Sequence, residues 1–307
     1  MEHNVVAPTD AEVPDLLAAM GVDPAQRESM MADTYVLEAI ADLDLHGIAP
    51  QWFGTHCSLL LLKPDAIVGR SVEPSVDWLT AQGWRIAHAA RVPAGRHLAR
   101  AMWHRSWVSA SVERRRLADL LVGICDALLL VVTREGGAAD TDASTDPAET
   151  APARLTRQKG PTPPSQRRPG ELRYLLGRHS YLLNLVHTPD TPIEVLREWA
   201  ITLDAPARER CLGDIAAGTD AADRARELGR ALYHTTPARS FDREQAWQQV
   251  VEQCAVVNPG DADDDDAAAA LLHTAWERGT PIDPWSTIVL GSYVLPMNTD
   301  PRIRRMK

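Results

Sequence analysis

Apolar residues follow two different spacings along the chain, and the change between them divides it into three parts. Over 8–20 and 32–45 they recur every three or four residues opposite acidic positions, a pattern that predicts helices. The segment 58–62 is continuously apolar and 84–92 alternates, as strands do. Helical spacing returns near the C-terminus. The pattern therefore predicts a helical extension at 1–50, a mixed region at 51–201 and a mostly helical extension at 202–307.

Strands and helices of the mixed region follow one another in an order that suits a small αβ sandwich. We expect strands at 58–62, 84–92, 126–133 and 181–186, and helices at 71–82, 98–107, 112–122 and 193–201. The expected fold class is α+β, with a four-stranded and mostly antiparallel sheet covered by helices.

Three segments outside these elements have a distinctive composition. The stretch 135–152 contains no large apolar residue and predicts a solvated, flexible insertion. The stretch 154–170 is dense in bases and prolines and predicts a loop. The aspartate run 261–266 lacks the glycine and distal glutamate of an EF-hand loop, so we interpret it as the acidic start of a helix rather than a calcium site.

Composition is that of a soluble globular protein, but charge is distributed unevenly. The 307 residues are 45% hydrophobic and 24% charged, with a net charge of −10 that argues against nucleic-acid or anionic-membrane binding. Ten acids and one base lie in 1–50, fifteen acids and nineteen bases in 51–200, and seventeen acids and twelve bases in 201–307. Seven bases and a single acid fall within 154–178. This distribution favours a local cationic pocket over a broad basic surface.

Four cysteines and the N-terminal residues indicate a cytoplasmic location. The cysteines form no Cys-x-x-Cys pair and no cluster of zinc spacing, so we expect reduced, buried thiols. No run approaches the roughly 18 to 20 apolar residues of a membrane-spanning helix. Residues 1–15 carry acids where a signal peptide has bases and an apolar stretch.

Motifs for the common phosphate loop, the dinucleotide fold and zinc proteases are absent from the sequence. Another set occurs in a fixed order, and through it the segment 57–200 resembles nucleoside diphosphate kinase. The matching motifs are Lys63-Pro64-Asp65 after a buried strand, Thr162 in a basic loop that closes with Pro169-Gly170-Glu171-Leu172-Arg173, Asn184-Leu185-Val186-His187, and then Asp190 and Glu198.

This resemblance implies a ferredoxin-like αβ sandwich and a ping-pong transfer through a phosphohistidine at His187. The γ-phosphoryl group of ATP, bound with Mg²⁺, would pass to a nucleoside diphosphate or a related phosphorylated small molecule. Glu198 would orient the histidine, and Lys63 would contact the transferring phosphate. Phosphoryl transfer depends mainly on positioning and charge neutralisation, which suits these residue types. The family also implies a homo-oligomer, and no residue is assigned as a metal ligand.

Further phosphate-binding residues follow from the same resemblance. Arg173, Thr162 and Asn184 match family positions directly. One of Arg114, Arg115 and Arg116 would supply a mid-helix arginine, with Arg114 in the best register, and Arg157 or Arg154 would supply the arginine ahead of Thr162, with Arg157 preferred.

The sequence departs from the family pattern near the histidine and at the base clamp. Pro189 stands where the family has a serine that helps to orient the histidine, although Thr188 and Thr191 each offer a hydroxyl. The aromatic residues that clamp the base are absent at matching places. Trp103, His104 and Trp107 are the nearest candidates, but the spacing of the two tryptophans on one helix face favours core packing.

Three functions therefore stay open. The first is a phosphotransferase that uses His187. The second is a catalytically retired kinase fold that binds nucleotide and acts as a regulator or scaffold. The third places the main function in 202–307. Retention of Lys63, Thr162, Arg173, Asn184, His187 and Glu198 together favours the first.

Overall fold

A four-stranded antiparallel sheet forms the centre of the protein. The computed structural model describes residues 12–134, 147–256 and 260–299. The strands are β1 (Cys57–Leu62), β2 (Trp84–Val92), β3 (Ala127–Arg134) and β4 (Val186–His187), arranged in the order β2-β3-β1-β4. This order is that of a ferredoxin-like sandwich, so the expected α+β fold class is confirmed.

Burial on both faces explains the unbroken apolar runs at 59–62 of β1 and 127–132 of β3. Every residue of β1 is buried, and so is every residue of β3 except Arg134 at its end. Leu59 and Leu61 pack into one core cluster, whereas Leu60 and Leu62 pack into a second on the opposite face. Each face of the sheet therefore carries its own helical layer.

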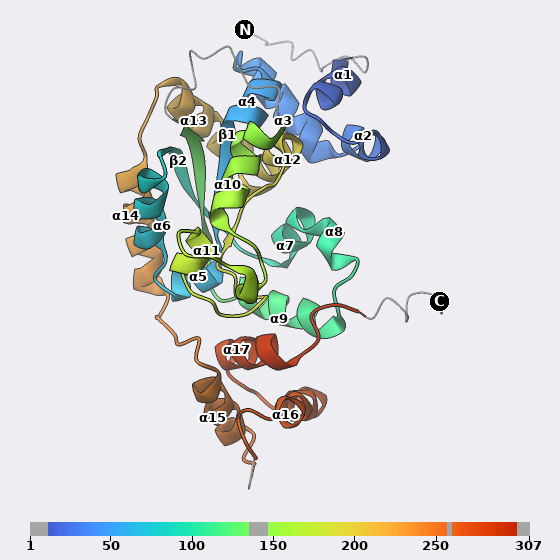
Figure 1. Cartoon of the computed structure of the whole chain (residues 1–307), viewed down its shortest axis with the longest axis vertical. Helices are drawn as coiled ribbons and strands as arrows, with labels where there is room; N and C mark the ends of the chain where they lie inside the picture. The colour runs from blue at the N-terminus through green and yellow to red at the C-terminus, as the bar shows by residue number, and fades with distance from the viewer. Residues whose placement is uncertain (1–11, 135–146, 257–259, 300–307) are drawn as a thin grey trace.

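Helices cover the two faces as separate layers (Figure 1). The Leu59 side packs against the N-terminal helices and against helices that follow β4, whereas the Leu60 side packs against helices that follow β1 and against later helices on either side of β4 in the sequence. Helices of the first layer include α1 (Glu12–Ala19), α2 (Pro24–Met31), α3 (Thr34–Leu45), α4 (Pro50–His56), α12 (Pro192–Thr202) and α13 (Ala205–Ala216). Helices of the second include α5 (Pro64–Val68), α6 (Val72–Ala81) and α14 (Ala222–Thr235).

A third core cluster lies where the C-terminal helices meet α9 (Val112–Val122). In Figure 1 these helices lie beyond one end of the sheet, with α17 next to α9. A Cβ atom added to Gly291 of α17 would come within 2.9 Å of the Leu117 side chain, so the glycine permits close packing of the two helices. The helices are α15 (Arg243–Gln253), α16 (Asp265–Arg278) and α17 (Pro284–Val294).

Several sequence expectations match these elements. The structure has helices at α3, α6, α9 and α12, and its first three strands lie within a residue or two of the expected ranges. Asp264 caps α16, as expected for the aspartate run. All four cysteines are free, with Cys57 and Cys211 buried.

Four expectations in the mixed region were wrong. The flexible insertion does not extend to 152, because 147–149 form a 3-10 helix, η1 (Pro147–Glu149), and α10 (Ala151–Lys159) begins two residues later; 135–146 lie outside the described residues. The basic loop expected at 154–170 is partly helical, because α10 continues to Lys159. The helix expected at 98–107 is interrupted at Trp103, and the strand expected at 181–186 is reduced to the two residues of β4. The remaining short elements are α7 (Arg96–Met102), α8 (His104–Trp107), η2 (Pro164–Gln166) and α11 (Leu172–Leu175).

None of the helices in the described ranges is long and apolar enough to cross a lipid bilayer.

A buried ion pair ties the N-terminal helices to α12. Asp33 caps α3 by accepting hydrogen bonds from the backbone of Tyr35 and Val36. Its second carboxylate oxygen accepts a 2.6 Å hydrogen bond from Arg197, whose side chain is 8% exposed and also donates to the carbonyl of Ala101. Since α12 also carries Glu198, this pair helps to fix the helix that supports the site.

Replacing Asp33 with alanine is expected to lower the free energy of unfolding by about 2–4 kcal/mol, because it removes a helix cap and leaves the buried Arg197 unpaired. Asp23→Ala is the matched control: Asp23 caps α2 from an exposed position without an ion pair, so about 1 kcal/mol is expected. Urea unfolding measures both variants. Equal losses would show that the ion pair to α12 contributes nothing.

Candidate active site

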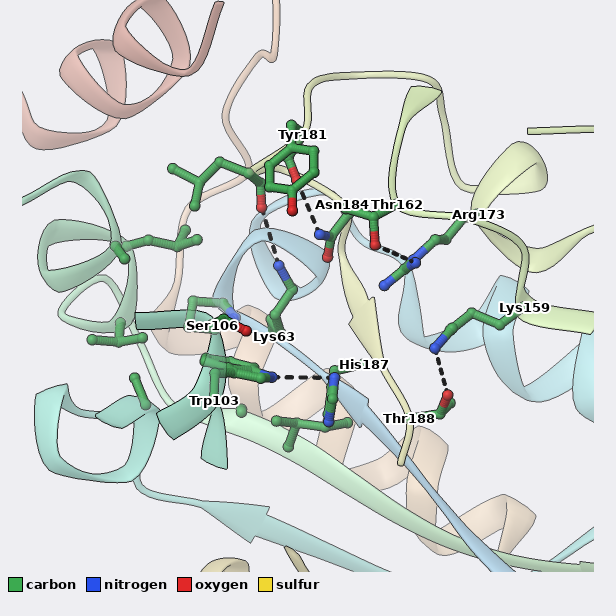
Figure 2. A pocket seen from close by; sticks show the side chains of 18 of the residues that line it. Lys63, Trp103, Ser106, Lys159, Thr162, Arg173, Tyr181, Asn184, His187 and Thr188 are labelled. Atoms are coloured by element: carbon green, nitrogen blue, oxygen red, sulfur yellow. Dashed lines mark hydrogen bonds between the residues drawn. The ribbon is translucent and has the colours of Figure 1, made fainter. Parts of the chain in front are cut away.

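A cavity of about 550 Å³ opens beside the end of β1. Figure 2 shows side chains around this space from the end of β1, from the junction of α7 and α8 and from the segment after α10, among them Lys63, Trp103 and Thr162. Its volume is within the usual range for small-molecule sites. Seven of the eight site residues expected from the sequence line it, namely Lys63, Arg114, Arg157, Thr162, Arg173, Asn184 and His187. The eighth, Glu198, lies behind His187 and contacts its ring.

The hydrogen bonds of His187 determine its tautomer. Nδ1 of its ring lies 3.2 Å from the indole nitrogen of Trp103, which can only donate. Nδ1 must therefore carry a lone pair. Nε2 lies 3.0 and 2.9 Å from the two carboxylate oxygens of Glu198, to which it donates its proton. The network thus holds a neutral imidazole, whose only lone pair on a ring nitrogen is at Nδ1 and is occupied by the indole N–H of Trp103.

Strand pairing places His187 beside Lys63. Leu61 of β1 pairs with His187, and Lys63 follows at the end of the same strand. The Lys63 ammonium is 3.3 Å from Asp65 and donates to the carbonyl of Leu182. Burial lowers the pKa of Lys63, an effect that the neighbouring Asp65 charge opposes. The lysine thus reaches the cavity with a carboxylate already beside it.

The basic loop presents Arg173 and Thr162 to the cavity. Arg173 is buried and donates to the Thr162 hydroxyl at 3.1 Å, and to the carbonyls of Gly160 and Val186. Its Nε is buried without a hydrogen-bond partner. Gly160 has a φ of 89°, and a Cβ there would overlap the Glu171 side chain, so only glycine fits this turn from α10 into the loop.

Arg167 holds the rest of the loop in shape. Its buried guanidinium donates to the carbonyls of Pro161, Thr162, Gly177 and Ser180. A single side chain thereby satisfies four backbone acceptors that no regular element pairs.

Arg114 and Arg157 occupy the cavity wall in different ways. Arg114, unlike Arg115 and Arg116, lines the cavity; its guanidinium donates to Asn298 and lies over the rings of Trp107 and Tyr181. The register preferred from the sequence thus agrees with the placement.

Arg157 is half exposed and pairs with Glu149 at 3.6 Å. Its guanidinium also donates to the carbonyl of Ala148. These partners lie outside the cavity lining, so Arg157 is a weaker candidate for phosphate contact than Arg173.

Neither threonine near Pro189 reproduces the missing serine. Thr188 is bonded to the Lys159 ammonium at 2.5 Å and to the Thr156 hydroxyl at 2.7 Å. Thr191 forms the capping box of α12 with Glu194. In the described part of the chain, the side-chain hydrogen bonds of the His187 ring are therefore those to Glu198 and Trp103.

Two cavity residues escaped the sequence interpretation. Core packing was favoured for Trp103, and its ring does pack against the first core cluster, but the helix breaks at this residue and the ring also meets His187 edge to face, with centroids 5.4 Å apart. Lys159 was placed in a loop, yet it ends α10 and is 4% exposed. The rarity of lysine, with only Lys63, Lys159 and Lys307 in the chain, was the available signal for the second residue.

Comparison with known proteins gives a likeness of fold over half the chain. No protein-family model matches the sequence, and no curated protein matches it. The structure is similar to nucleoside diphosphate kinase from Aquifex aeolicus, with 16% identity, a TM-score of 0.40 and coverage of 50% of this chain and 97% of that one. For the enzyme from Encephalitozoon cuniculi the values are 14%, 0.41, 50% and 91%, and for an NDP kinase from Pyrobaculum aerophilum 17%, 0.39, 50% and 97%. The roles of individual residues rest on the geometry described above.

Trp103→Phe is expected to make His187 about 2- to 10-fold more reactive toward diethyl pyrocarbonate, because it removes the hydrogen bond that occupies the Nδ1 lone pair. Peptide mass spectrometry over time measures the rate at His187, with the exposed His97 as an internal reference.

Trp107→Phe is the matched control, since the Trp107 indole donates to the carbonyl of Ala99 and not to the histidine. An unchanged rate at His187 in Trp103→Phe would contradict the inferred network.

Proposed function

We propose that this protein is a phosphotransferase in which His187 accepts the γ-phosphoryl group of a nucleoside triphosphate and passes it to a nucleoside diphosphate or a related phosphorylated small molecule. One observation carries the proposal. The imidazole of His187 lines a cavity that also contains Lys63 and Arg173, with Glu198 bonded to Nε2 and the Trp103 indole donating to Nδ1. A nucleophile, an orienting base and cations meet at one place.

The geometry supports a two-step transfer. Nδ1 attacks the γ-phosphorus, a nitrogen–phosphorus bond forms, and the bond to the bridging oxygen breaks, so that the nucleoside diphosphate leaves with the electron pair. Nε2–H stays bonded to Glu198, whose negative charge stabilises the positive charge that develops on the ring. Lys63 and Arg173 offset the charge of the phosphoryl oxygens. In the second step, a phosphate oxygen of the acceptor attacks the phosphohistidine and restores the free ring.

Mg²⁺ fits this scheme as a part of the substrate. No group of three or more histidine, cysteine, aspartate or glutamate residues suited to a metal occurs within the described ranges. The oxygens of the triphosphate would therefore supply ligands for the ion, and the cationic side chains would contact the remaining phosphate oxygens.

The position of Trp103 favours a second candidate function, a nucleotide-binding regulator without transferase activity. As long as the indole N–H donates to Nδ1, no phosphorus atom can approach that lone pair. Transfer thus requires the indole to move when the nucleotide binds, whereas a retired site would leave it in place.

Incubation with Mg-ATP is expected to add one acid-labile phosphoryl group per chain, detected by intact mass spectrometry. The group should be absent in His187→Ala and present in His97→Ala, which removes an exposed histidine outside the cavity lining. Adding a nucleoside diphosphate should then discharge it. Nucleotide binding without any label would reject the transferase and support the regulator, and a label retained in His187→Ala would reject His187 as the nucleophile.

A further inference from the structure

Lys159 is a buried cation in the wall of the cavity. It is the last residue of α10 and is 4% exposed, so its ammonium is withdrawn from water as fully as that of Lys63, which is 7% exposed. Both lysines line the same cavity. An ammonium group is costly to bury unless an opposite charge or several acceptors compensate for the lost hydration.

The two lysines differ in the groups that replace the lost hydration of their ammonium groups. Lys63 lies beside the carboxylate of Asp65. Lys159 donates to the hydroxyl of Thr188 at 2.5 Å and to that of Thr156 at 3.5 Å, and within the described ranges it forms no ion pair with a carboxylate. Its ammonium form is therefore left without a direct counter-charge from the described part of the chain.

The guanidinium of Arg173 likewise has no carboxylate partner among the described residues. Its hydrogen bonds go to two carbonyls and a hydroxyl, and its buried Nε has no partner. Burial, together with the Arg167 charge, lowers the pKa of Arg173 to about 10, so it still carries a positive charge at neutral pH. Arg173 and Lys159 together make this side of the cavity a site for a multiply charged anion.

We propose that Lys159 is an anion-binding residue that contacts a terminal phosphoryl group of the polyphosphate held in this cavity, and that it takes up a proton as the anion binds. The inference rests on the proposed function for its ligand class, but binding does not require that transfer to His187 occurs. It adds a residue to the phosphate site that no expectation from the sequence included.

Electrostatics around Lys159 support the proton uptake. Burial and the neighbouring Arg173 charge lower the pKa of Lys159 to about 7, although Asp190 in the loop and Glu194 and Glu198 on α12 act in the opposite direction. The amine of the empty cavity is thus partly neutral near pH 7. A phosphoryl dianion beside it would raise its pKa, because a nearby negative charge favours the ammonium form.

A chain of hydroxyls links the buried amine to solvent. Lys159 donates to Thr188, whose hydroxyl is 2.7 Å from that of Thr156, and the latter donates to the exposed Asp190 at 2.9 Å. Reorientation of the two hydroxyls could carry a proton inward along this path. Proton uptake therefore does not require the cavity to open.

The sign of the pH dependence follows from linkage. The bound state holds one proton more than the free state at pH values above about 7, so affinity should fall as pH rises from 7 toward the raised pKa of the complex. Phosphate groups, whose second pKa is about 6, are almost fully ionised over this range and contribute little to the slope.

Calorimetric titration of the full-length protein tests the affinity, with Mg²⁺ and the non-transferable analogue adenylyl imidodiphosphate, and separately with Mg²⁺ and inorganic tripolyphosphate. Lys159→Met and Lys159→Gln should each bind about 10- to 100-fold more weakly at pH 7, as expected for the loss of a charged hydrogen bond. Gln retains a donor for Thr188, which protects the fold if Met does not. Arg168→Gln removes an exposed positive charge from the same loop and should bind within twofold of wild type.

Proton uptake is measured from the same titrations at pH 8 in buffers of different ionisation enthalpy. The wild type should take up close to one proton per bound anion, and Lys159→Arg should bind without uptake because its guanidinium stays charged. A purely structural lysine would leave both the uptake and the pH slope unchanged in Lys159→Arg. Unchanged uptake and pH slope in Lys159→Arg would overturn the proposal. So would a twofold or smaller loss of affinity in folded Lys159→Gln, or a wild type that binds neither probe.

The test separates this inference from the proposed function. Normal phosphorylation of His187 with unaltered binding by the Lys159 variants would leave the transferase intact and remove Lys159 from the site. Conversely, the Lys159 variants could lose tripolyphosphate binding while the wild type is never phosphorylated at His187. The cavity would then be an anion site without transfer.

Discussion

The buried carboxylate of Asp65 joins the two chain segments from which the cavity is built. One oxygen accepts the backbone N–H of Leu185 at 2.9 Å and lies 3.3 Å from the Lys63 ammonium. Leu185 has a φ of 63°, a left-handed conformation that is unusual for leucine and needs support from its surroundings. The Asp65 contact therefore holds the strained residue that leads the chain into β4. His187 can then pair with β1 and approach Lys63.

The cations of the cavity differ in the groups that stabilise their charge. Lys63 has a carboxylate, whereas Arg173 directs its guanidinium group mainly to backbone carbonyls, as Arg167 does in the adjoining loop. Carbonyl dipoles stabilise a buried cation without neutralising it. The positive potential on this side of the cavity is thereby preserved for a ligand, at the expense of stability that carboxylate partners would have supplied. The net charge of −10 belongs to the rest of the molecule, which suits a discrete anion site and not a broad basic surface.

Strong apolar patterns made much of the fold predictable, and ordered motifs predicted seven of the residues that line the cavity. The apolar patterns of β1 and α12 indicate a strand and a helix without ambiguity. The chain runs from His187 at the end of a strand through a turn into α12, and this spacing brings Glu198 to the histidine ring. The rest depends on tertiary structure. Pro152 and a high density of bases look like a loop, yet proline is tolerated in the first turn of α10. Helical spacing through Trp103 concealed the break at this residue, whose indole contacts His187, and no local pattern reveals that Lys159 is buried.

The packing of α17 on α9 has a consequence for synthesis on the ribosome. Arg114 reaches the cavity from α9, and its guanidinium is held by Asn298, while Ala110 just before the helix bridges to that same residue. The sheet and its two helical layers precede these contacts in the order of translation, since domains form from the N-terminus as the chain emerges. The nascent chain can thus complete the contact between His187 and Glu198 long before Asn298 is available to hold Arg114. A chain released before Asn298 is made would carry every residue that lines the cavity, but its Arg114 would lack the side chain that holds the guanidinium.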